Sequence, residues 1–360
     1  MKLLIAGGGT GGHIFPGIAV AACFQTRAKT HDVVFIGSPQ GLETTVVPKA
    51  GFRLILLPIS GLRRMGAVHF IKGVLQLPVA LILAVVTILV ERPNVALSVG
   101  GYAAGPAILV AALLRIPTFV LEQNSVPGFT NKLLGFFARA VFVAFPDTQF
   151  PAHKTKLLGN PVRKDLIFLR EQKYTPKVPL GILVLGGSRG ARAINEVMVA
   201  FANYIQDNHL PITVTHQTGS LDYERVKNAY QEQHCDFHVT AFIEDVARAY
   251  RECDLVICRA GAMTLAEITL IGRPSILVPF PFATDDHQHK NAEILEQHGA
   301  ARVILQKDFN AKALWQLLKE LVGHHEKLEQ MADNARFLGK PRATEDIVDL
   351  LLKEAQSVSR

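Results

Sequence analysis

Residues 2–20 read KLLIAGGGTGGHIFPGIAV: an apolar run, five glycines within positions 7–12, a histidine at 13, and a second apolar run. A glycine in an ordered element costs about 0.5–1 kcal/mol relative to alanine. This loop therefore needs a reason to lack side chains. A strand, a glycine-rich turn and a helix in this order are typical of nucleotide-binding α/β sheets, where free N–H groups at the helix N-terminus bind anions.

The composition is that of a globular protein of two domains. The chain has 360 residues, of which 49% are hydrophobic and 19% charged. Residues 1–160 hold 14 Lys and Arg against 5 Asp and Glu, so the net charge of +7 is concentrated in the first half. This favours an anionic surface or ligand there. No basic cluster interleaved with aromatic residues is present, so nucleic acid is not expected as a partner.

Four cysteines without CxxC spacing, and an N-terminus that runs directly into the first strand, indicate thiols of a cytosolic protein without a signal peptide.

Short apolar runs alternate with helical stretches through the whole chain. These runs are continuously apolar, as in parallel strands that are covered on both faces. The expected strands are 2–6, 32–37, 52–58, 94–100, 117–122 and 140–145 in the first half, and 181–187, 212–219, 254–261 and 275–280 in the second. The pattern predicts an α/β protein with two Rossmann-like, doubly wound parallel sheets.

A glycine-rich turn follows the first strand of each half, GGGTGGH at 7–13 and GGSRGA at 186–191. We therefore expect a domain over 1–160, a second over 161–340, and a C-terminal helix over 341–360 that packs back on the first domain. Ligands of open parallel sheets bind beyond the carboxyl ends of the strands. A cleft between the two domains is the expected binding site.

The string Gly7-x-Gly9-x-x-Gly12 also matches the dinucleotide fingerprint. An NAD-dependent oxidoreductase needs an acidic residue at the end of the second strand to hold the ribose. Here that strand continues into SPQG, and the first acid is Glu43. The NAD alternative loses support at this point.

The second half carries two further motifs. CRAGAMTLAEI at 258–268 predicts a strand, a turn at Gly261 and a helix containing Glu267, whose carboxylate suits a ribose diol. The motif at 279–295 contains Asp285, Asp286, His287 and His289 at a predicted helix N-terminus. The two histidines point to different sides of that helix, so no metal site and no cofactor are expected.

With these motifs assembled, the chain resembles the MurG family of bacterial peptidoglycan N-acetylglucosaminyltransferases over nearly its whole length. The matching stretches are GGGTGGHIFPGIAVA, SVGGYAAGP, LEQNSVPG, GNPVR, GGSRGARAIN, CRAGAMTLAEI and DDHQHKNA. The resemblance implies the two-domain GT-B fold. It also implies inverting transfer of GlcNAc from UDP-GlcNAc to undecaprenyl-diphospho-MurNAc-pentapeptide (lipid I), which gives lipid II.

The resemblance also implies roles for individual residues. Those expected on the sugar and acceptor side are Thr10, Gly11, Gly12 and Asn124. The donor diphosphate would meet Arg163 and Ser188, the uracil edge the backbone of Ile243, and the GlcNAc hydroxyls Gln288. The stretch expected to wrap the nucleotide is Ala262, Met263, Thr264, Leu265, Ala266 and Glu267.

His13 is the one histidine inside a glycine loop and is the candidate general base; the alternative is a capping or acceptor-positioning role. Two other functions remain possible from the residues. One is a GT-B glycosyltransferase with another lipid acceptor, and the other is a non-catalytic sugar-nucleotide binding module.

Residues 73–90, GVLQLPVALILAVVTILV, contain no charge over 18 positions, at the lower limit for a membrane-spanning helix. Spanning would divide one sheet between the two sides of a bilayer. The alternatives are a core helix and a helix that exposes an apolar face, flanked by Arg63, Arg64, Lys72 and Arg92. The second predicts peripheral binding to an anionic membrane surface, on the cytoplasmic face of the cell membrane.

Overall fold

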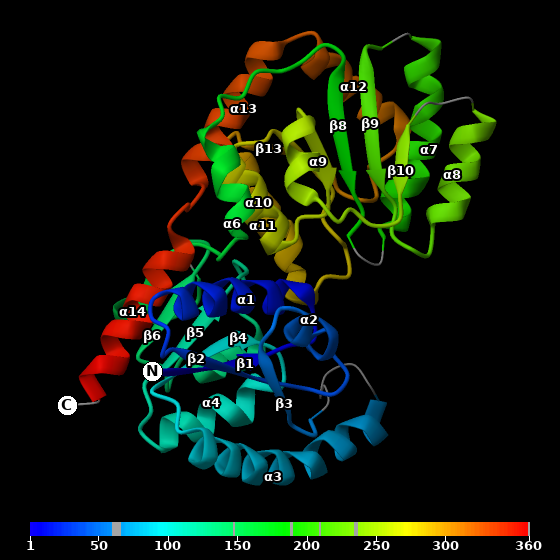
Figure 1. Ribbon diagram of the computed structural model, residues 1–360. Helices are drawn as coiled ribbons and strands as arrows, with labels where there is room; N and C mark the ends of the chain where they lie inside the picture. The colour runs from blue at the N-terminus through cyan, green and yellow to red at the C-terminus, as the bar shows by residue number, and fades with distance from the viewer. Residues whose placement is uncertain (60–65, 147, 188–189, 209, 234–236, 359–360) are drawn as a thin grey trace. The chain divides into compact units, whose positions relative to one another are not determined.

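The computed structural model describes residues 1–59, 66–146, 148–187, 190–208, 210–233 and 237–358. Two compact units divide the chain. Unit 1 comprises residues 1–163 and 340–360, and unit 2 comprises residues 164–339 (Figure 1). Each unit is an α/β sheet structure with its own core. Ser188 and Arg63–Arg64 lie outside the described residues.

The sheet of unit 1 is fully parallel and has the strand order β3-β2-β1-β4-β5-β6-β7. Its strands are β1 (Lys2–Gly7), β2 (Asp32–Gly37), β3 (Arg53–Leu56), β4 (Val95–Gly100), β5 (Thr118–Glu122), β6 (Ala140–Val143) and β7 (Thr155–Leu157). Its helices are α1 (Gly11–Thr26), α2 (Glu43–Lys49), α3 (Gly66–Glu91), α4 (Ala104–Leu113), α5 (Phe129–Leu134) and α14 (Ala343–Val358).

Helices cover both faces of this sheet. Along β1, Leu3 and Ile5 contribute to one core, whereas Leu4 and Ala6 contribute to the other. The first core includes residues of α1 and α14, and the second includes residues of α3 and α4. The double coverage explains why the strands are continuously apolar rather than alternating.

The C-terminal helix α14 belongs to unit 1. Ile347 and Leu351 are fully buried in the core that α1 also lines. Ion pairs strengthen the contact: Arg27 lies 2.8 Å from Asp349 in α14, and the Arg139 guanidinium lies 2.6 Å from the carboxylate of Glu354. The chain therefore returns to its first unit after completing the second.

The sheet of unit 2 is also fully parallel, with the order β10-β9-β8-β11-β12-β13. Its strands are β8 (Leu180–Leu185), β9 (Ile212–Gln217), β10 (His238–Thr240), β11 (Leu255–Cys258), β12 (Ser275–Leu277) and β13 (Ala301–Val303). The helices are α6 (Lys164–Ile167), α7 (Arg192–Asp207), α8 (Tyr223–Glu232), α9 (Val246–Glu252), α10 (Ala262–Ile271), α11 (His287–Gln297), α12 (Ala311–Val322) and α13 (His325–Leu338). Among the described residues there are also 3₁₀ turns: η1 (Ala152–Lys154) in unit 1, and η2 (Phe168–Glu171) and η3 (Thr284–Asp286) in unit 2.

The predicted fold class is confirmed, because both units are parallel sheets with a Rossmann-type strand order. The sequence missed β7, β10 and β13. Each has three residues and lies at the edge of its sheet, so each lacks the continuous apolar run that buried strands show.

Candidate functional site

In unit 1, two glycine-containing loops meet where the strand order reverses. This topological switch point lies between β1 and β4, where ligands of such sheets bind. The Gly8 N–H donates to the Gly100 carbonyl oxygen at 3.0 Å. A Cβ added to Gly101 would overlap the Gly8 carbonyl oxygen. The close contact between these two loops therefore explains in part why residues 7–12 hold five glycines.

His13 lies in the first turn of α1, at the same switch point. Its Nδ1 is 3.1 Å from the Gly8 carbonyl oxygen and 3.4 Å from Thr10 Oγ1. Its Nε2 would lie 3.1 Å from a Cβ on Gly100, so the absence of a side chain at Gly100 leaves room for the imidazole. Nε2 has no hydrogen-bond partner among the described residues.

The glycine loop offers free backbone donors only at its far end. Glu43 is fully buried, and its Oε2 accepts the Gly9 N–H at 2.8 Å. The amides of Thr10, Gly11 and Gly12 have no partner within the part of the chain that the structure describes. They form the open N-terminus of α1.

The buried Glu43 carboxylate also accepts two hydrogen bonds from Ser38. Cβ atoms on Gly8 or Gly41 would overlap the carboxylate, and one on Gly37 would overlap Glu43 Cγ. The lack of side chains at these three glycines therefore leaves room for Glu43, which holds the start of the glycine loop.

A buried network positions Asn124, which follows β5. Glu122 is 1% exposed; its Oε1 accepts the Asn124 N–H at 3.1 Å and its Oε2 accepts the Gly128 N–H at 3.0 Å. Asn131 donates to Glu122 Oε2 at 3.0 Å and accepts from Ser98 Oγ at 2.8 Å. The loop that presents Asn124 is thus held by a carboxylate whose bonds are all internal.

In unit 2 the strand order reverses between β8 and β11, which places two loops at the equivalent switch point. The loop after β8 contacts β9: the Gly186 N–H donates to the Gln217 carbonyl at 3.0 Å. Gly190, at φ +82°, approaches the Thr218 carbonyl so closely that a Cβ would overlap it. The loop after β11 leads to Gly261, the N-cap of α10.

The residues of the predicted nucleotide segment start α10. Leu265 is 1% exposed, and its N–H donates to the Gly261 carbonyl, so it contributes packing. Glu267 is half-buried, and its Oε2 accepts the Tyr250 hydroxyl at 3.0 Å. The other members of the segment are Ala262, which is buried, and Met263, Thr264 and Ala266, which are half-buried.

Gln288 lies in the first turn of α11. Its Oε1 accepts the Phe280 N–H at 3.0 Å, which leaves the NH₂ group as the end that can donate to a ligand. Arg259 fixes the Phe280 loop: its guanidinium donates to the Val278 and Pro279 carbonyls at 3.0 and 3.1 Å, and lies 5.4 Å from the Phe280 ring centroid.

Two other predicted residues lie in loops. Ile243 follows β10 and is half-buried, and within the described chain its backbone N–H and carbonyl have no hydrogen-bond partner. Arg163 is half-buried and is the last residue of the first segment of unit 1. Ser188, the remaining residue predicted for the diphosphate, lies outside the described residues.

The acids just before α11 and the histidines in its first turn contact one another and the backbone. His287 Nδ1 lies 2.7 Å from the Thr284 carbonyl, and His289 Nδ1 lies 3.1 Å from Asp286 Oδ2. Across the described ranges, no three His, Cys, Asp or Glu side chains gather closely enough to hold a metal ion.

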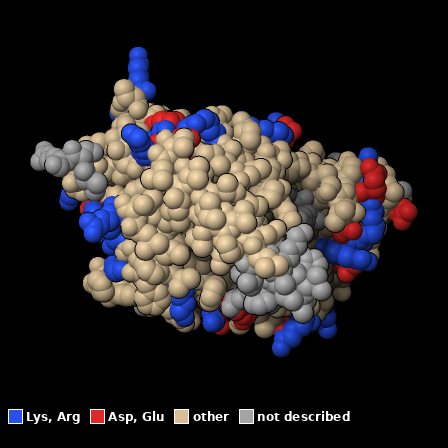
Figure 2. All heavy atoms as spheres, turned by 90° about the horizontal axis from the view of Figure 1, so that it is seen from below, with Lys and Arg blue, Asp and Glu red and all other residues tan. Residues whose placement is uncertain are grey.

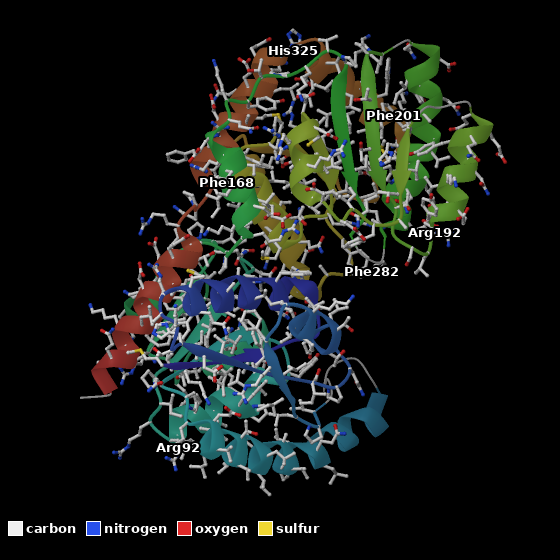
Figure 3. The ribbon with its side chains drawn as sticks, viewed as in Figure 1. Arg92, Phe168, Arg192, Phe201, Phe282 and His325 are labelled. Atoms are coloured by element: carbon white, nitrogen blue, oxygen red, sulfur yellow. The ribbon has the colours of Figure 1, made fainter. Side chains whose placement is uncertain are left out.

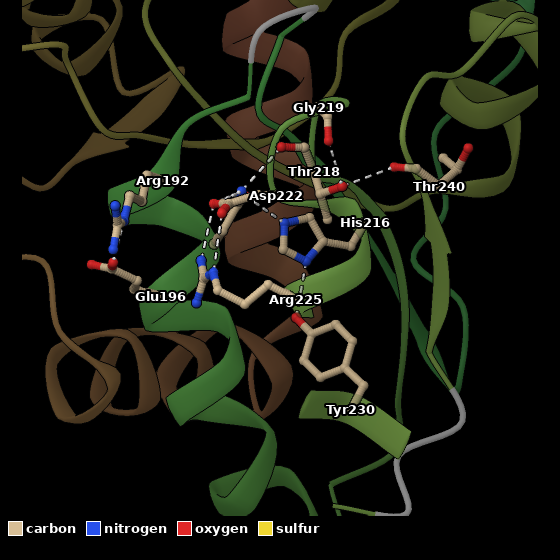
Figure 4. Close-up of polar contacts among 10 residues, drawn as sticks. Arg192, Glu196, His216, Thr218, Gly219, Asp222, Arg225, Tyr230 and Thr240 are labelled. Atoms are coloured by element: carbon tan, nitrogen blue, oxygen red, sulfur yellow. Dashed lines mark hydrogen bonds and ion pairs between the residues drawn. The ribbon is translucent and has the colours of Figure 1, made fainter. Parts of the chain in front are cut away.

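A buried hydrogen-bond network around His216 joins β9 to α7 and α8 (Figure 4). His216 Nδ1 is 2.9 Å from the Tyr230 hydroxyl, and its Nε2 is 3.0 Å from Asn195 Oδ1. Asn195 Nδ2 donates to the Thr218 carbonyl and to Asp222. Burial lowers the pKa of His216 from 6.5 to about 3, so the imidazole is neutral.

Sequence reasoning missed Glu43, Tyr250 and Arg259 as parts of the site. In the sequence Glu43 is only the first acid after the second strand, and Tyr250 lies in the short helix α9 without a motif around it. Their partners are 34 and 17 residues distant in the chain. The one available signal was Arg259, a charge directly after a buried strand.

Comparison with known proteins gives consistent matches over the whole chain. The models that match are the glycosyltransferase family 28 N-terminal domain over residues 3–143 and its C-terminal domain over residues 181–350. A protein of Myxococcus xanthus is 43% identical over 352 residues, covering 97% of this chain and 92% of that protein. A relative from Geobacter metallireducens is 41% identical and covers 98% of both chains.

Both relatives carry the name UDP-N-acetylglucosamine–N-acetylmuramyl-(pentapeptide) pyrophosphoryl-undecaprenol N-acetylglucosamine transferase. Among solved structures, Acinetobacter baumannii MurG matches with a TM-score of 0.79 and 34% identity, covering 98% of this chain and 99% of that one. A UDP-GlcNAc 2-epimerase from Neisseria meningitidis shares the fold, with a TM-score of 0.68 at 14% identity.

Proposed function

Because this chain belongs to glycosyltransferase family 28, we propose that it transfers N-acetylglucosamine from UDP-GlcNAc to lipid I with inversion, giving lipid II for peptidoglycan synthesis. The observation that carries the proposal is the relationship over full length: proteins named for this transfer are 41–44% identical across 97–98% of the chain. The sequence prediction of a MurG-type glycosyltransferase agrees with these comparisons.

Unit 2 would bind the donor. The half-buried Glu267 carboxylate suits the ribose hydroxyls because it is a charged acceptor in the α10 segment. The backbone of Ile243, whose N–H and carbonyl have no partner within the described chain, suits the uracil edge. The Gln288 NH₂ group is turned away from Phe280 and would donate to the sugar hydroxyls. The remaining donor residues proposed are Arg163 and Ser188 at the diphosphate and Ala262, Met263, Thr264, Leu265 and Ala266 along the nucleotide.

Unit 1 would supply the base and the acceptor contacts. The Gly8 carbonyl can only accept, so His13 Nδ1 carries the proton and Nε2 keeps its lone pair. The acceptor hydroxyl would attack the anomeric carbon while its proton passes to His13 Nε2. The acceptor would be held by Asn124 and by the free amides of Thr10, Gly11 and Gly12.

Breaking the bond between the anomeric carbon and the diphosphate leaves negative charge on UDP. The groups available to stabilise that charge are the N-terminus of α10, the β8 loop and Arg163. These would supply backbone dipoles and one permanent cation.

A lipid-linked acceptor requires contact with a membrane, and α3 has the surface for it. Ala80, Ala84 and Ile88 are buried against the α4 core, whereas Leu75, Val79, Ile82 and Val86 are 50–70% exposed. Figure 2, which shows the molecule from below the view of Figure 1, on the side of α3, has a broad area without charged residues; Lys and Arg, with some Asp and Glu, lie around it. Arg92, exposed directly after α3, is one such cation (Figure 3).

Among the described residues, no helix is both long enough and apolar enough to cross a membrane. We therefore propose peripheral binding of the α3 face to anionic lipid on the cytoplasmic side, with apolar insertion and a cationic border acting together.

The test is turnover. Purified protein should transfer labelled GlcNAc from UDP-GlcNAc to a lipid I analogue. Transfer to diacylglycerol but not to the lipid I analogue would favour the alternative of another lipid acceptor. UDP-GlcNAc binding without any transfer would leave a binding module.

A further inference from the structure

The carboxylate proposed to bind ribose has a buried partner. The Tyr250 side chain is fully buried in α9, and its hydroxyl donates to Glu267 Oε2 at 3.0 Å. The Tyr250 main chain is anchored as well, because the buried Arg273 Nε donates to the Tyr250 carbonyl at 3.0 Å. Since Arg273 follows the C-cap of α10, Tyr250 connects α9 to the middle of α10 and to the segment just after it.

We propose that Tyr250 is a positioning residue, which holds the Glu267 carboxylate in the orientation that accepts hydrogen bonds from the ribose of a nucleoside diphosphate. This inference rests on the proposed function, in which Glu267 binds that ribose. It adds a residue that contacts no substrate itself.

The chemistry of the pair indicates that Tyr250 donates to Glu267 and thereby orients it. Burial and the neighbouring Glu267 charge both raise the pKa of Tyr250 well above 10. Tyr250 therefore remains a proton donor throughout the physiological pH range. A carboxylate has about four lone-pair positions, so a bond to Tyr250 at Oε2 can orient the side chain without using all of its acceptor capacity. A half-buried glutamate without this bond would sample several rotamers.

The opposite relationship is also conceivable: Glu267 could be present only to satisfy a buried phenol, which needs a partner. The two cases differ in ligand binding. If Tyr250 acts through Glu267, removing its hydroxyl changes ribose recognition. If the pair serves the fold alone, removal lowers stability and leaves recognition as it was.

The experiment uses the full-length protein and calorimetric titration with UDP and with 2′-deoxy-UDP. Tyr250→Phe removes one oxygen. We expect the Kd for UDP to rise about fivefold, a change of the size that the loss of one hydrogen bond produces. The preference for UDP over 2′-deoxy-UDP should shrink, because a misplaced carboxylate gains less from the 2′-hydroxyl. In the Glu267→Ala background, Tyr250→Phe should change the Kd for UDP no further.

Tyr174→Phe is the matched control. Tyr174 is also a buried tyrosine of unit 2, and its hydroxyl donates to the Asp254 carbonyl at 3.0 Å instead of to Glu267. This variant should lose stability and keep both Kd values. Equal changes in Tyr250→Phe and Tyr174→Phe, or an unchanged preference for UDP, would overturn the inference.

If Tyr250→Phe does not fold, Glu267→Asp keeps the charge but withdraws it from Tyr250 by one methylene. Its Kd for UDP should match that of Glu267→Ala, and a value within twofold of the parent would overturn the inference. A parent protein that binds no UDP at all would contradict the proposed function instead.

Discussion

His13 Nδ1 lies 3.1 Å from the carbonyl oxygen of Gly8. This contact fixes the neutral imidazole as the Nδ1–H tautomer, so the lone pair is on Nε2. Gly8 is itself held by Gly100, to whose carbonyl it donates. The glycine loop therefore orients the proposed base through the Gly8 carbonyl, with Thr10 Oγ1 at 3.4 Å from the same nitrogen.

His13→Ala should lower kcat about a hundredfold or more, which is the usual contribution of a general base. The Kd for UDP should change little, because His13 is not among the proposed donor contacts, which apart from Arg163 are in unit 2. Steady-state kinetics with a lipid I analogue and calorimetry with UDP measure the two effects.

His31→Ala is the control for that variant, since His31 Nδ1 also contacts a backbone carbonyl in unit 1, that of Phe24 at 3.0 Å. A His13→Ala protein with normal kcat and a raised acceptor KM would assign His13 a positioning role. Normal values of both would make it structural.

Glu267→Ala should weaken binding of UDP by about 1.5–3 kcal/mol, the range for hydrogen bonds to a charged group. Calorimetry with UDP measures it. Glu252→Ala, which removes an exposed carboxylate paired with Arg248 at 2.7 Å, should leave the affinity unchanged. An unaltered Kd in Glu267→Ala would exclude Glu267 from the donor site.

Gln288→Ala should reduce the discrimination between UDP-GlcNAc and UDP-GalNAc. The Gln288 carbonyl end is bonded to the Phe280 N–H, so the NH₂ end is the one able to distinguish the orientation of a sugar hydroxyl. The ratio of kcat/KM for the two donors is the relevant measurement. The same ratio in mutant and parent would contradict this role.

Unit 2 should lose stability on acidification through His216. Its pKa is about 3 in the folded protein and 6.5 when unfolded, so below pH 6.5 the unfolded chain binds a proton that the folded chain does not. The free energy of unfolding should fall by about 1.4 kcal/mol per pH unit from pH 6 downwards.

Urea titration followed by tryptophan fluorescence can measure this loss, because Trp315, the one tryptophan of the chain, packs against the core of unit 2. His216→Gln should show a shallower dependence between pH 8 and pH 5. At pH 8 the histidine is neutral in both states, so the difference between variants there reports contacts alone. Parallel pH profiles would contradict the prediction.

The strand–glycine–helix junctions were predictable because they depend on local patterns. A buried parallel strand is a continuous apolar run, and the glycines directly follow it, as at Gly7 and Gly186. The residues that support the site were not predictable in the same way. Glu43 reaches Gly9, and Tyr250 reaches Glu267, only because the sheet order and helix packing bring them together. No sequence spacing encodes those contacts.

The character of residues 73–90 was also ambiguous from sequence, since a helix apolar on all sides does not reveal which side is covered. In the structure, Ala80, Ala84 and Ile88 face the core, whereas Leu75, Val79, Ile82 and Val86 are exposed. The exposed alternative is therefore the one observed.

Glutamate substitutions on α3 test the proposed membrane contact. Leu75, Val79 and Ile82 are 70%, 50% and 64% exposed, so a charge at these positions needs no burial. At least one of Leu75→Glu, Val79→Glu and Ile82→Glu should fold normally and bind anionic liposomes poorly. That variant should retain activity on a short-chain, water-soluble acceptor and lose it on an acceptor embedded in a bilayer.

Two controls separate docking from folding. Ile88→Glu places a charge at a position only 2% exposed and should unfold unit 1. Leu221→Glu changes a residue of unit 2 that is 86% exposed and should alter neither folding nor liposome binding. Raising salt should weaken liposome binding of the parent only in part, because salt screens the cationic border and not the apolar contact. Folded α3 variants that bind liposomes as the parent does would place the membrane contact on another surface.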